Sequence, residues 1–392
     1  MKVPLLDLKQ QNAPLAAELR AAFERVLASG QFILGPEVDE LERQTAALVE
    51  VKHAVGVSSG TDAILLALMA LDIGPGDEVI CPSFTFFATA GCVARVGATP
   101  VFADSCPVCF NLDVEDAARR ITPRTKAIIP VHLFGQSAEM EGVVKLAEAH
   151  GLAVIEDAAQ ALGAAYRGRR VGSIGTIGTF SFYPSKNLGG FAEGGLLVTN
   201  DDALAGRARL MRVHGAEAKY FHKMVGGNFR LPPLHAALLS VKLPHLARYS
   251  EARMKNACYY TIRLRELKGV AEYGELPARA AFIVTPAAHS HNEHIWNQYT
   301  LRVAPGEKWK QAGNPRDALK NHLAAREIGS EIYYPRPMHL QECFAHFGPY
   351  PALPVCERLA AECLSIPVYP ELAREQQDAV VTAIAEFLAE NS

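Results

Sequence analysis

Short apolar runs alternate with longer amphipathic stretches from about residue 53 of this 392-residue chain. Helical stretches such as residues 61–71 (TDAILLALMAL) and 138–151 (AEMEGVVKLAEAHG) lie between the runs. Strands joined through helices need crossover connections, so this pattern predicts an α/β fold with a mainly parallel central sheet flanked by helices. Continuous apolar runs such as AIIPV suit a sheet that is covered on both faces. The predicted strands are residues 53–59, 78–82, 98–104, 126–133, 152–158, 176–183 and 195–200.

The pattern changes after about residue 245, where a long helix over residues 246–267 leads into a smaller α+β region. We therefore predict a large domain over residues 1–245 and a small C-terminal domain over residues 246–392. The small domain is predicted to contain strands at 295–303 and 330–334 and helices at 316–326 and 376–390. In the large domain, an early helix should end near Gly30, and a second should start at Pro36, where proline costs little.

Composition excludes several classes of partner. Lys and Arg number 39 against 42 Asp and Glu, a net charge of 39 − 42 = −3, so no broad attraction for nucleic acid or anionic lipid is expected. The first residues lack an apolar core of signal-peptide length, and there is no apolar run of about 18 residues. Eight cysteines in a chain of this size are expected to be reduced thiols. We predict a cytoplasmic protein with no membrane partner.

The first candidate site is the sequence Ser-Ser-Gly-Thr-Asp at residues 58–62, between a predicted strand and a predicted helix. A helix N-terminus presents free N–H groups and a partial positive charge, which suits a phosphate. Gly60 would let the backbone approach a ligand closely, and Thr61 could add a hydroxyl. An ordinary N-cap is the alternative. The chain contains neither the GxxxxGK[ST] loop nor the GxGxxG fingerprint.

Two further candidates are a carboxylate and a lysine. Asp157 stands at the carboxyl end of a buried-looking strand, where open α/β sheets bind ligands, although a helix cap is equally compatible. Lys186 lies among small residues and glycines just after another strand. Shelter from solvent disfavours an ammonium ion, which helps a lysine act as an amine nucleophile. The Tyr-x-x-x-Lys pair of short-chain dehydrogenases is excluded, because residue 182 is Phe.

A phosphate cradle, a strand-end carboxylate and a lysine amine are together what pyridoxal phosphate requires. The chain also resembles the fold type I sugar aminotransferases of the DegT/DnrJ/EryC1/StrS family over nearly its whole length. The motifs that carry this resemblance are GQFILGPEVDELE, SSGTDAI, GPGDEVICPSFTFFAT, PVHLFGQ, VIEDAAQALGA, SFYPSKNLGG, EGGLLVTND, GGNFRL and EIYYPRPMHLQECF.

The resemblance implies an aspartate-aminotransferase-like large domain and a role for each matching residue. Lys186 matches the lysine that bonds the cofactor and moves the proton, and Asp157 matches the partner of the pyridinium nitrogen. Matches to the remaining cofactor contacts are Gln160 near the cofactor hydroxyl, Phe86 stacked on the ring, and Gly60, Thr61 and Ser181 at the phosphate. For Phe86, core packing at the head of a helix is the alternative.

Other implied contacts involve a second copy of the chain and the sugar. Asn228 matches an asparagine that reaches the phosphate of the neighbouring subunit, which implies a homodimer with shared active sites. The sugar side is expected near Gly35, Tyr334, His339 and Arg230 of the partner. Packing in the small domain is the alternative for Tyr334 and His339.

The chain departs from the family pattern at three places. Prolines follow Arg230 and Leu231, which leaves the details of that dimer-facing segment open. Cys106 and Cys109 form a CxxC pair that could be redox-active or half a zinc site, and an inert pair is favoured. His289, His291 and His294 could bind a metal. A loop with one histidine near substrate is favoured for them, and no metal is predicted.

The resemblance implies transfer of an amino group from an amino acid, L-glutamate, to a nucleotide-linked keto sugar. The segment HGAEAKYFHKMVGGNFRL favours amination at C3 over C4. One alternative is a pyridoxamine-dependent sugar dehydratase, which carries His where this chain has Lys186. The other is a regulatory protein that retains the cofactor pocket.

Overall fold

A seven-stranded sheet forms the centre of the computed structural model, which describes residues 1–272, 282–304, 309 and 313–391. β9 pairs antiparallel with β1 and β8, and the other strand pairs are parallel, which confirms the prediction of a mainly parallel sheet. In spatial order the strands are β1 (His53–Val57), β9 (Gly195–Thr199), β8 (Ile177–Ser181), β5 (Ala153–Asp157), β4 (Thr125–Ile128), β2 (Glu78–Pro82) and β3 (Thr99–Ala103).

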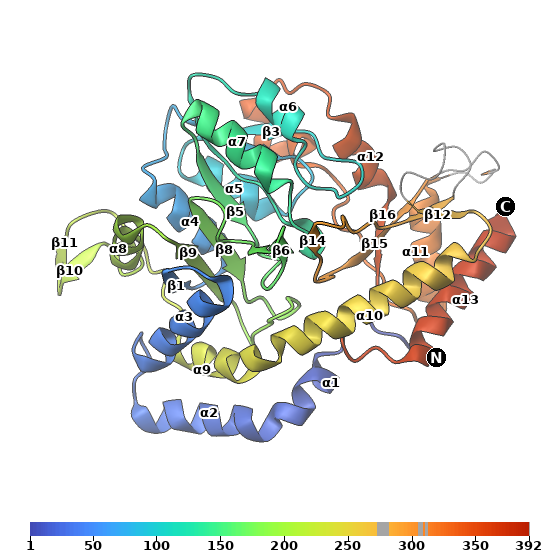
Figure 1. The fold of residues 1–392 in the computed structure, drawn as a ribbon, viewed down its shortest axis with the longest axis horizontal. Coiled ribbons are helices and arrows are strands. Elements are labelled where there is room, and N and C mark those ends of the chain that lie inside the picture. Colours follow the sequence, from blue (N-terminus) through green and yellow to red (C-terminus); the bar gives the residue numbers. More distant parts are fainter. Residues whose placement is uncertain (273–281, 305–308, 310–312, 392) are drawn as a thin grey trace.

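Helices cover both faces of this sheet (Figure 1). Side chains alternate between the faces along each strand, so Val154 of β5 joins one core cluster and Ile155 joins another. The helices on the Ile155 face are α4 (Gly60–Ala70), α5 (Phe87–Arg95) and α8 (Asp202–Met211). Those on the other face are α3 (Pro36–Val49), α6 (Val114–Arg119) and α7 (Met140–His150), with α2 (Ala16–Ser29) and α9 (Pro233–Lys242) outside α3.

Local signals determine where the first helices end and begin. α2 ends before Gly30, whose left-handed φ of 65° is a conformation that glycine adopts without strain. α3 begins at Pro36, whose missing N–H would have no partner inside the helix. Both helix boundaries predicted from the sequence are confirmed.

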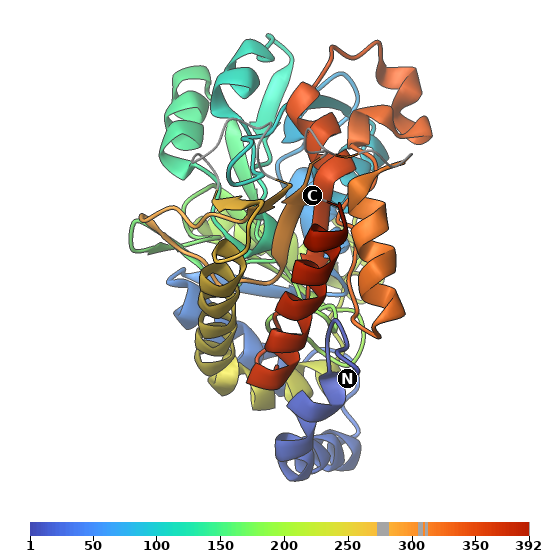
Figure 2. The ribbon, with the colours of Figure 1, turned by 90° about the vertical axis from the view of Figure 1, so that its right-hand side faces the viewer.

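A second, four-stranded sheet lies in the C-terminal part, in the order β12 (Val270–Glu272), β13 (Ile283–Thr285), β15 (Tyr299–Val303) and β16 (Cys363–Ile366). Helices α10 (Leu246–Arg265), α11 (Pro315–Ala325) and α13 (Arg374–Asn391) pack around it and run alongside one another in Figure 2. Val3 belongs to this core and pairs with Ile328, whereas α12 (Pro354–Glu362) packs into the core of the large sheet. The chain thus crosses between the two regions near both ends, and a domain division at residue 245 stays a prediction.

The remaining strands are short. β6 (Ala165–Tyr166) pairs with β7 (Arg169–Arg170) and β14 (Asn292–Glu293). The hairpin of β10 (Ala216–Ala218) and β11 (Phe221–His222) projects from one end of the molecule, at the left of Figure 1. No helix within the described ranges is both long and apolar enough to span a membrane.

The predicted strand over residues 330–334 is wrong. Only Glu331 pairs there, through a single bridge to Ser365. Successive side chains of a strand point to opposite faces, but Tyr333 and Tyr334 both line one cavity. The chain therefore leaves the ladder. The strand predicted at 295–303 is shorter than expected, because β15 begins only at Tyr299.

Candidate functional site

A cavity of about 450 Å³ lies beside the carboxyl ends of β1, β2, β5 and β8. That end of an open α/β sheet is where ligands bind. Most of the residues predicted from the sequence as cofactor contacts line this cavity, together with one predicted sugar contact: Gly60, Thr61, Phe86, Asp157, Gln160, Ser181, Lys186 and Tyr334. The structure therefore brings together residues from widely separated parts of the chain.

The start of α4 forms one end of the cavity. Ser59 is the N-cap and accepts a hydrogen bond from the N–H of Asp62 at 3.0 Å. The first helical hydrogen bond comes from the N–H of Ala63, so the N–H groups of Gly60 and Thr61 precede the ladder. A Cβ added at Gly60 would lie 2.8 Å from Cβ of Ser181, which is too close. Glycine thus lets the helix end approach β8 and leaves N–H groups for an anion.

Asp157 is the last residue of β5, and its side chain is 5% exposed. Burial raises the pKa of this carboxyl group, because the charged form loses its hydration. The hydroxyl of Thr89 opposes that shift by donating to Oδ2 at 2.8 Å, and the N–H of Ala159 donates to Oδ1 at 3.3 Å. These two donors orient the carboxylate of Asp157 and favour its ionised form.

Lys186 lies in a tight loop after β8, where its own N–H donates to the carbonyl of Tyr183. Loss of hydration lowers the pKa of its amine to about 8, although the nearby Asp157 opposes the shift. The loop needs glycine at residue 189, since a Cβ there would lie 2.0 Å from the carbonyl oxygen of Pro184. An amine with this pKa is partly neutral at physiological pH and can attack a carbonyl carbon.

Gln160 and Tyr334 form a hydrogen-bonded pair on the cavity wall. The amide of Gln160 donates to the Tyr334 hydroxyl at 3.1 Å and accepts from the N–H of Phe134 at 2.7 Å. Phe86 is 55% exposed at the head of α5, and its ring centroid lies 6.2 Å from that of Tyr334. Phe86 therefore contributes an apolar ring to the cavity lining and is not packed in the core.

Three predicted substrate contacts do not line this cavity. Gly35 caps α3, and Arg230 pairs with Val57 beside the end of β1. His339 is buried, with Nδ1 2.7 Å from the Ser83 hydroxyl and Nε2 3.4 Å from Glu357. Their roles toward the sugar stay predictions.

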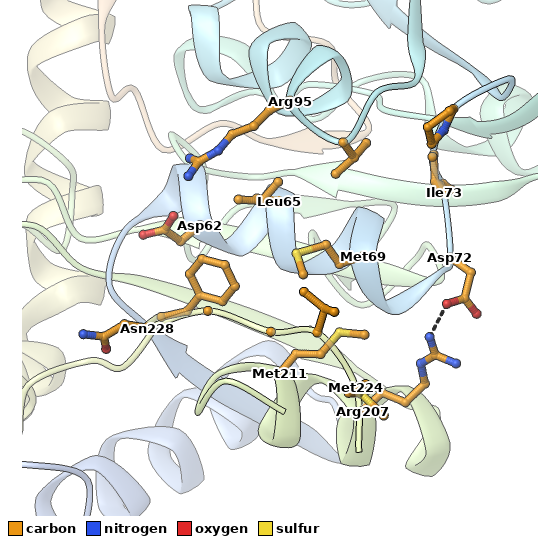
Figure 3. A pocket seen from close by; sticks show the side chains of 17 residues that line it. Asp62, Leu65, Met69, Asp72, Ile73, Arg95, Arg207, Met211, Met224 and Asn228 are labelled. Atoms are coloured by element: carbon orange, nitrogen blue, oxygen red, sulfur yellow. Dashed lines mark hydrogen bonds and ion pairs between the residues drawn. The ribbon is translucent and has the colours of Figure 1, made fainter. Parts of the chain in front are cut away.

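Asn228 lies in a different and wider hollow of about 850 Å³, shown in Figure 3. Asp62 and Leu65 of α4 line this hollow, whereas Thr61 and Ile64 line the cavity around Lys186. The two hollows are therefore separated by the first turns of α4. In this chain Asn228 is therefore not part of the wall of the cavity around Lys186.

The three histidines of the C-terminal loop do not line the cavity around Lys186. His294 stacks on Trp296 with ring centroids 3.9 Å apart, and burial lowers its pKa to about 3. Among the described residues, no group of three or more His, Cys, Asp or Glu side chains is arranged to hold a metal ion.

Several cavity residues escaped prediction from the sequence. Thr85 could have been found, because it follows the carboxyl end of β2. Thr89 does not line the cavity but donates to Asp157, and it has no such signal, since it is one small residue within a helix. The others include Tyr183, Glu193, Gln298 and Tyr333, for which the sequence also carries no clear signal.

The comparisons with known proteins agree with this geometry. The sequence model of the DegT/DnrJ/EryC1/StrS aminotransferase family matches residues 14–385. A pleiotropic regulatory protein of Geobacillus stearothermophilus is 48% identical over 99% of this chain and 99% of that protein. A UDP-N-acetyl-3-dehydro-alpha-D-glucosamine 3-aminotransferase of Acidithiobacillus ferrooxidans is 44% identical over 98% of each.

The solved structure of DesV from S. venezuelae, in complex with a ketimine intermediate, has a TM-score of 0.89 to this chain. It is 42% identical, and the alignment covers 98% of both chains. The predicted fold type I architecture is confirmed by this likeness and by the strand order of the large sheet.

Proposed function

The chain belongs to the DegT/DnrJ/EryC1/StrS aminotransferase family, and on that premise we propose that it transfers an amino group from L-glutamate to a nucleotide-linked keto sugar. Pyridoxal phosphate is the cofactor of this reaction. The observation that carries the proposal is the convergence of Lys186, Asp157 and the start of α4 on one cavity.

The cavity suits this cofactor in size and in chemistry. Its volume of about 450 Å³ lies within the range of small-molecule sites, about 300–1,000 Å³. The N–H groups at the start of α4 suit a phosphate, and the close approach of Gly60 to Ser181 adds a hydroxyl to that end. Asp157 supplies a buried carboxylate for a protonated ring nitrogen, and Lys186 supplies an amine for an aldehyde.

When bound, pyridoxal phosphate supplies an aldehyde that combines with amines and a ring that accepts electrons from a broken Cα–H bond. Asp157 would hold a proton on the ring nitrogen and so sustain that electron acceptance. Lys186 would hold the cofactor covalently until the amino group of the donor takes its place. The Lys186 amine would then move the proton from Cα of the donor. Phe86 and Tyr334 would lie beside the ring, and Gln160 would lie near the ring hydroxyl.

We place the sugar beside Tyr334, which lines the cavity. Gly35 and His339, together with Arg230 of the partner subunit, complete the sugar side. Amination at C3 is favoured by the segment at residues 214–231 and by the activity for which the Acidithiobacillus relative is named.

A homodimer supplies the remaining phosphate contact through Asn228 of the partner subunit. In support, Asn228 lies in a hollow of its own subunit that α4 separates from the cavity. The hairpin and loop that precede it carry exposed apolar side chains, with Tyr220 81%, Phe221 73% and Val225 84% exposed. Exposed apolar surface of this kind is typical of protein interfaces.

The test begins with the visible absorbance of the bound cofactor, which Lys186→Ala should abolish. Adding L-glutamate to the wild-type protein should bleach that absorbance and yield 2-oxoglutarate. A panel of nucleotide-linked 3-keto and 4-keto sugars then decides substrate and position by mass spectrometry of the amino sugar. A wild-type protein that binds no pyridoxal phosphate would contradict the proposal.

A regulatory role is the second candidate, because the Geobacillus relative is named a pleiotropic regulatory protein. Binding of the cofactor without a half-reaction for any amino acid would favour that role. The dehydratase alternative predicts dehydration without net amination, and the presence of Lys186 argues against it.

A further inference from the structure

A turn that carries Cys106 and Cys109 follows β3, at the edge of the large sheet. Two backbone hydrogen bonds close the turn: the N–H of Phe110 donates to the Cys106 carbonyl at 3.0 Å, and the N–H of Cys106 donates to Asn111 at 2.7 Å. Both cysteines are free thiols, and their side chains lie close enough for each to shift the pKa of the other. The turn therefore places the side chains of Cys106 and Cys109 next to each other.

The two sulfurs have different surroundings. The side chain of Cys109, the side chain of His289 and the N–H groups of Cys109 and Val108 lie around the Cys106 sulfur. Chiefly the Cys109 thiol, and then His289 and these N–H groups, favour a negative charge on Cys106 and lower its pKa to about 4. Contact with Cys106 and burial raise the pKa of Cys109. Cys106 is partly exposed, and Cys109 is only 6% exposed. One thiol is thus charged and accessible, and its neighbour is protonated and shielded.

The other charged groups near the turn also leave the Cys106 thiolate favoured. His289 has a raised pKa, chiefly through Cys106 and also through Glu139. The guanidinium of Arg302 donates to the carbonyl of Pro107 at 3.4 Å and forms an ion pair with Glu362. An imidazole whose pKa is raised and a guanidinium therefore face the turn from the C-terminal part of the chain.

We propose that Cys106 and Cys109 form a redox-active dithiol that reacts with low-molecular-weight disulfides, with Cys106 as the attacking and Cys109 as the resolving residue. The Cys106 thiolate attacks one sulfur of the small disulfide, whose S–S bond breaks to release one thiolate and leave a mixed disulfide on Cys106. Cys109 gives its proton to the released thiolate and attacks the Cys106 sulfur, which expels the second small thiolate. The second small thiolate takes up a proton from the solvent, which balances the proton that Cys106 released on ionising. The protein loses two electrons as its internal disulfide forms, and the small disulfide is reduced to two thiols.

The turn lies just behind the wall of the cavity around Lys186. Cys109 lines a small hollow together with Leu133 and Gln298, and both of those residues also line the cavity. The reaction should therefore be tested on the protein with its cofactor bound. The cofactor absorbance then reports in each variant whether the fold and the cavity are intact.

The first experiment measures iodoacetamide alkylation at each cysteine between pH 6 and pH 8 by peptide mass spectrometry. Cys258 and Cys343 are exposed and serve as internal controls. Alkylation of an ordinary thiol falls about tenfold per pH unit below its pKa, so the controls should slow by that factor. Cys106 should change less than about twofold, because it stays a thiolate. A Cys106 rate that falls with the controls would overturn the assignment.

The second experiment treats the reduced protein with oxidised glutathione. The wild-type peptide should lose two hydrogens as the Cys106–Cys109 disulfide forms. Cys109→Ser should instead retain glutathione on Cys106, and Cys106→Ser should carry none on Cys109. Glutathione found only on Cys258 or Cys343, or no disulfide in the wild-type protein, would refute the proposal. These readouts do not depend on amino transfer, so they stay informative if the proposed function fails.

Discussion

Thr89 shows how a single hydroxyl can control the candidate site. Its donation to Oδ2 of Asp157 at 2.8 Å is the main effect that opposes the burial-induced rise in the pKa of that carboxyl group. The Thr85 hydroxyl lies 3.0 Å from the Thr89 hydroxyl, so a second hydrogen bond links Thr85 to Thr89. The ionised state of Asp157 therefore depends on residues that do not themselves carry charge.

Thr89→Val keeps the branched shape of the side chain and removes the donor. A hydrogen bond to a charged group contributes about 1.5–3 kcal/mol, so the half-reaction with L-glutamate should slow about tenfold to hundredfold. Stopped-flow absorbance of the cofactor measures this rate. Thr89→Ser retains the hydroxyl and is the matched control, which should stay within a few-fold of the wild-type rate. Equal rates for both variants would remove Thr89 from this role.

The pKa of Lys186, lowered to about 8, predicts how cofactor capture depends on pH. Only the neutral amine attacks an aldehyde, so a lowered pKa makes the reactive form available at lower pH. Cofactor-free protein mixed with pyridoxal phosphate should gain visible absorbance at a rate that rises with pH and levels off above about 8. Asp157→Asn should move that midpoint lower, because the carboxylate raises the pKa of Lys186. A midpoint near that of ordinary lysine, about 10.4, would contradict the sheltered amine.

At the scale of the element, the start of α4 is the feature on which phosphate binding depends. Its approach to β8 leaves no room for a side chain at Gly60, where a Cβ would lie 2.8 Å from Ser181. By contrast, Gly206 lies inside α8, and a Cβ there would meet nothing within 4 Å. These two helical glycines provide a natural comparison.

Gly60→Ala should push α4 away from β8 and weaken pyridoxal phosphate binding by about tenfold or more, the equivalent of one lost hydrogen bond to a charged group. Gly206→Ala should leave that affinity unchanged and stabilise the protein by about 0.5–1 kcal/mol, because alanine restricts the unfolded chain. Equilibrium dialysis and thermal unfolding measure the two effects. Unchanged affinity in Gly60→Ala would show that the close approach is not needed for binding.

At the scale of the whole molecule, the separation of Asn228 from the cavity by α4 makes the proposed sharing of active sites between subunits testable. Lys186→Ala and Asn228→Asp subunits, co-expressed with different tags, should each be inactive as homodimers. The hybrid dimer contains one site with both native residues, since Lys186 and Asn228 would come from different subunits. An equal, random mixture should therefore regain about one quarter of the wild-type activity, because half of the dimers are hybrids with one intact site. No recovery in purified hybrid dimers would place the action of Asn228 within its own subunit.

The sequence by itself determined the features that depend on neighbouring residues along the chain. The alternation of apolar runs predicted the mainly parallel sheet, and Gly30 and Pro36 predicted helix ends. Lys186 and Asp157 were identifiable because each follows or ends an apolar strand, and the strands of a parallel sheet end at the same edge. Local patterns carry this information because strand and helix periodicity act over a few residues.

The tertiary structure alone decided which distant residues meet. The hydroxyl of Thr89 donates to Asp157, and Gln298 lines the cavity. The segment at residues 330–334, which was predicted as a strand, places Tyr333 and Tyr334 at the cavity. The tertiary structure also brings His289 close to Cys106, so that the two cysteines of the CxxC pair have different surroundings. These contacts join segments far apart in the chain, and their positions depend on how whole elements pack rather than on any local period.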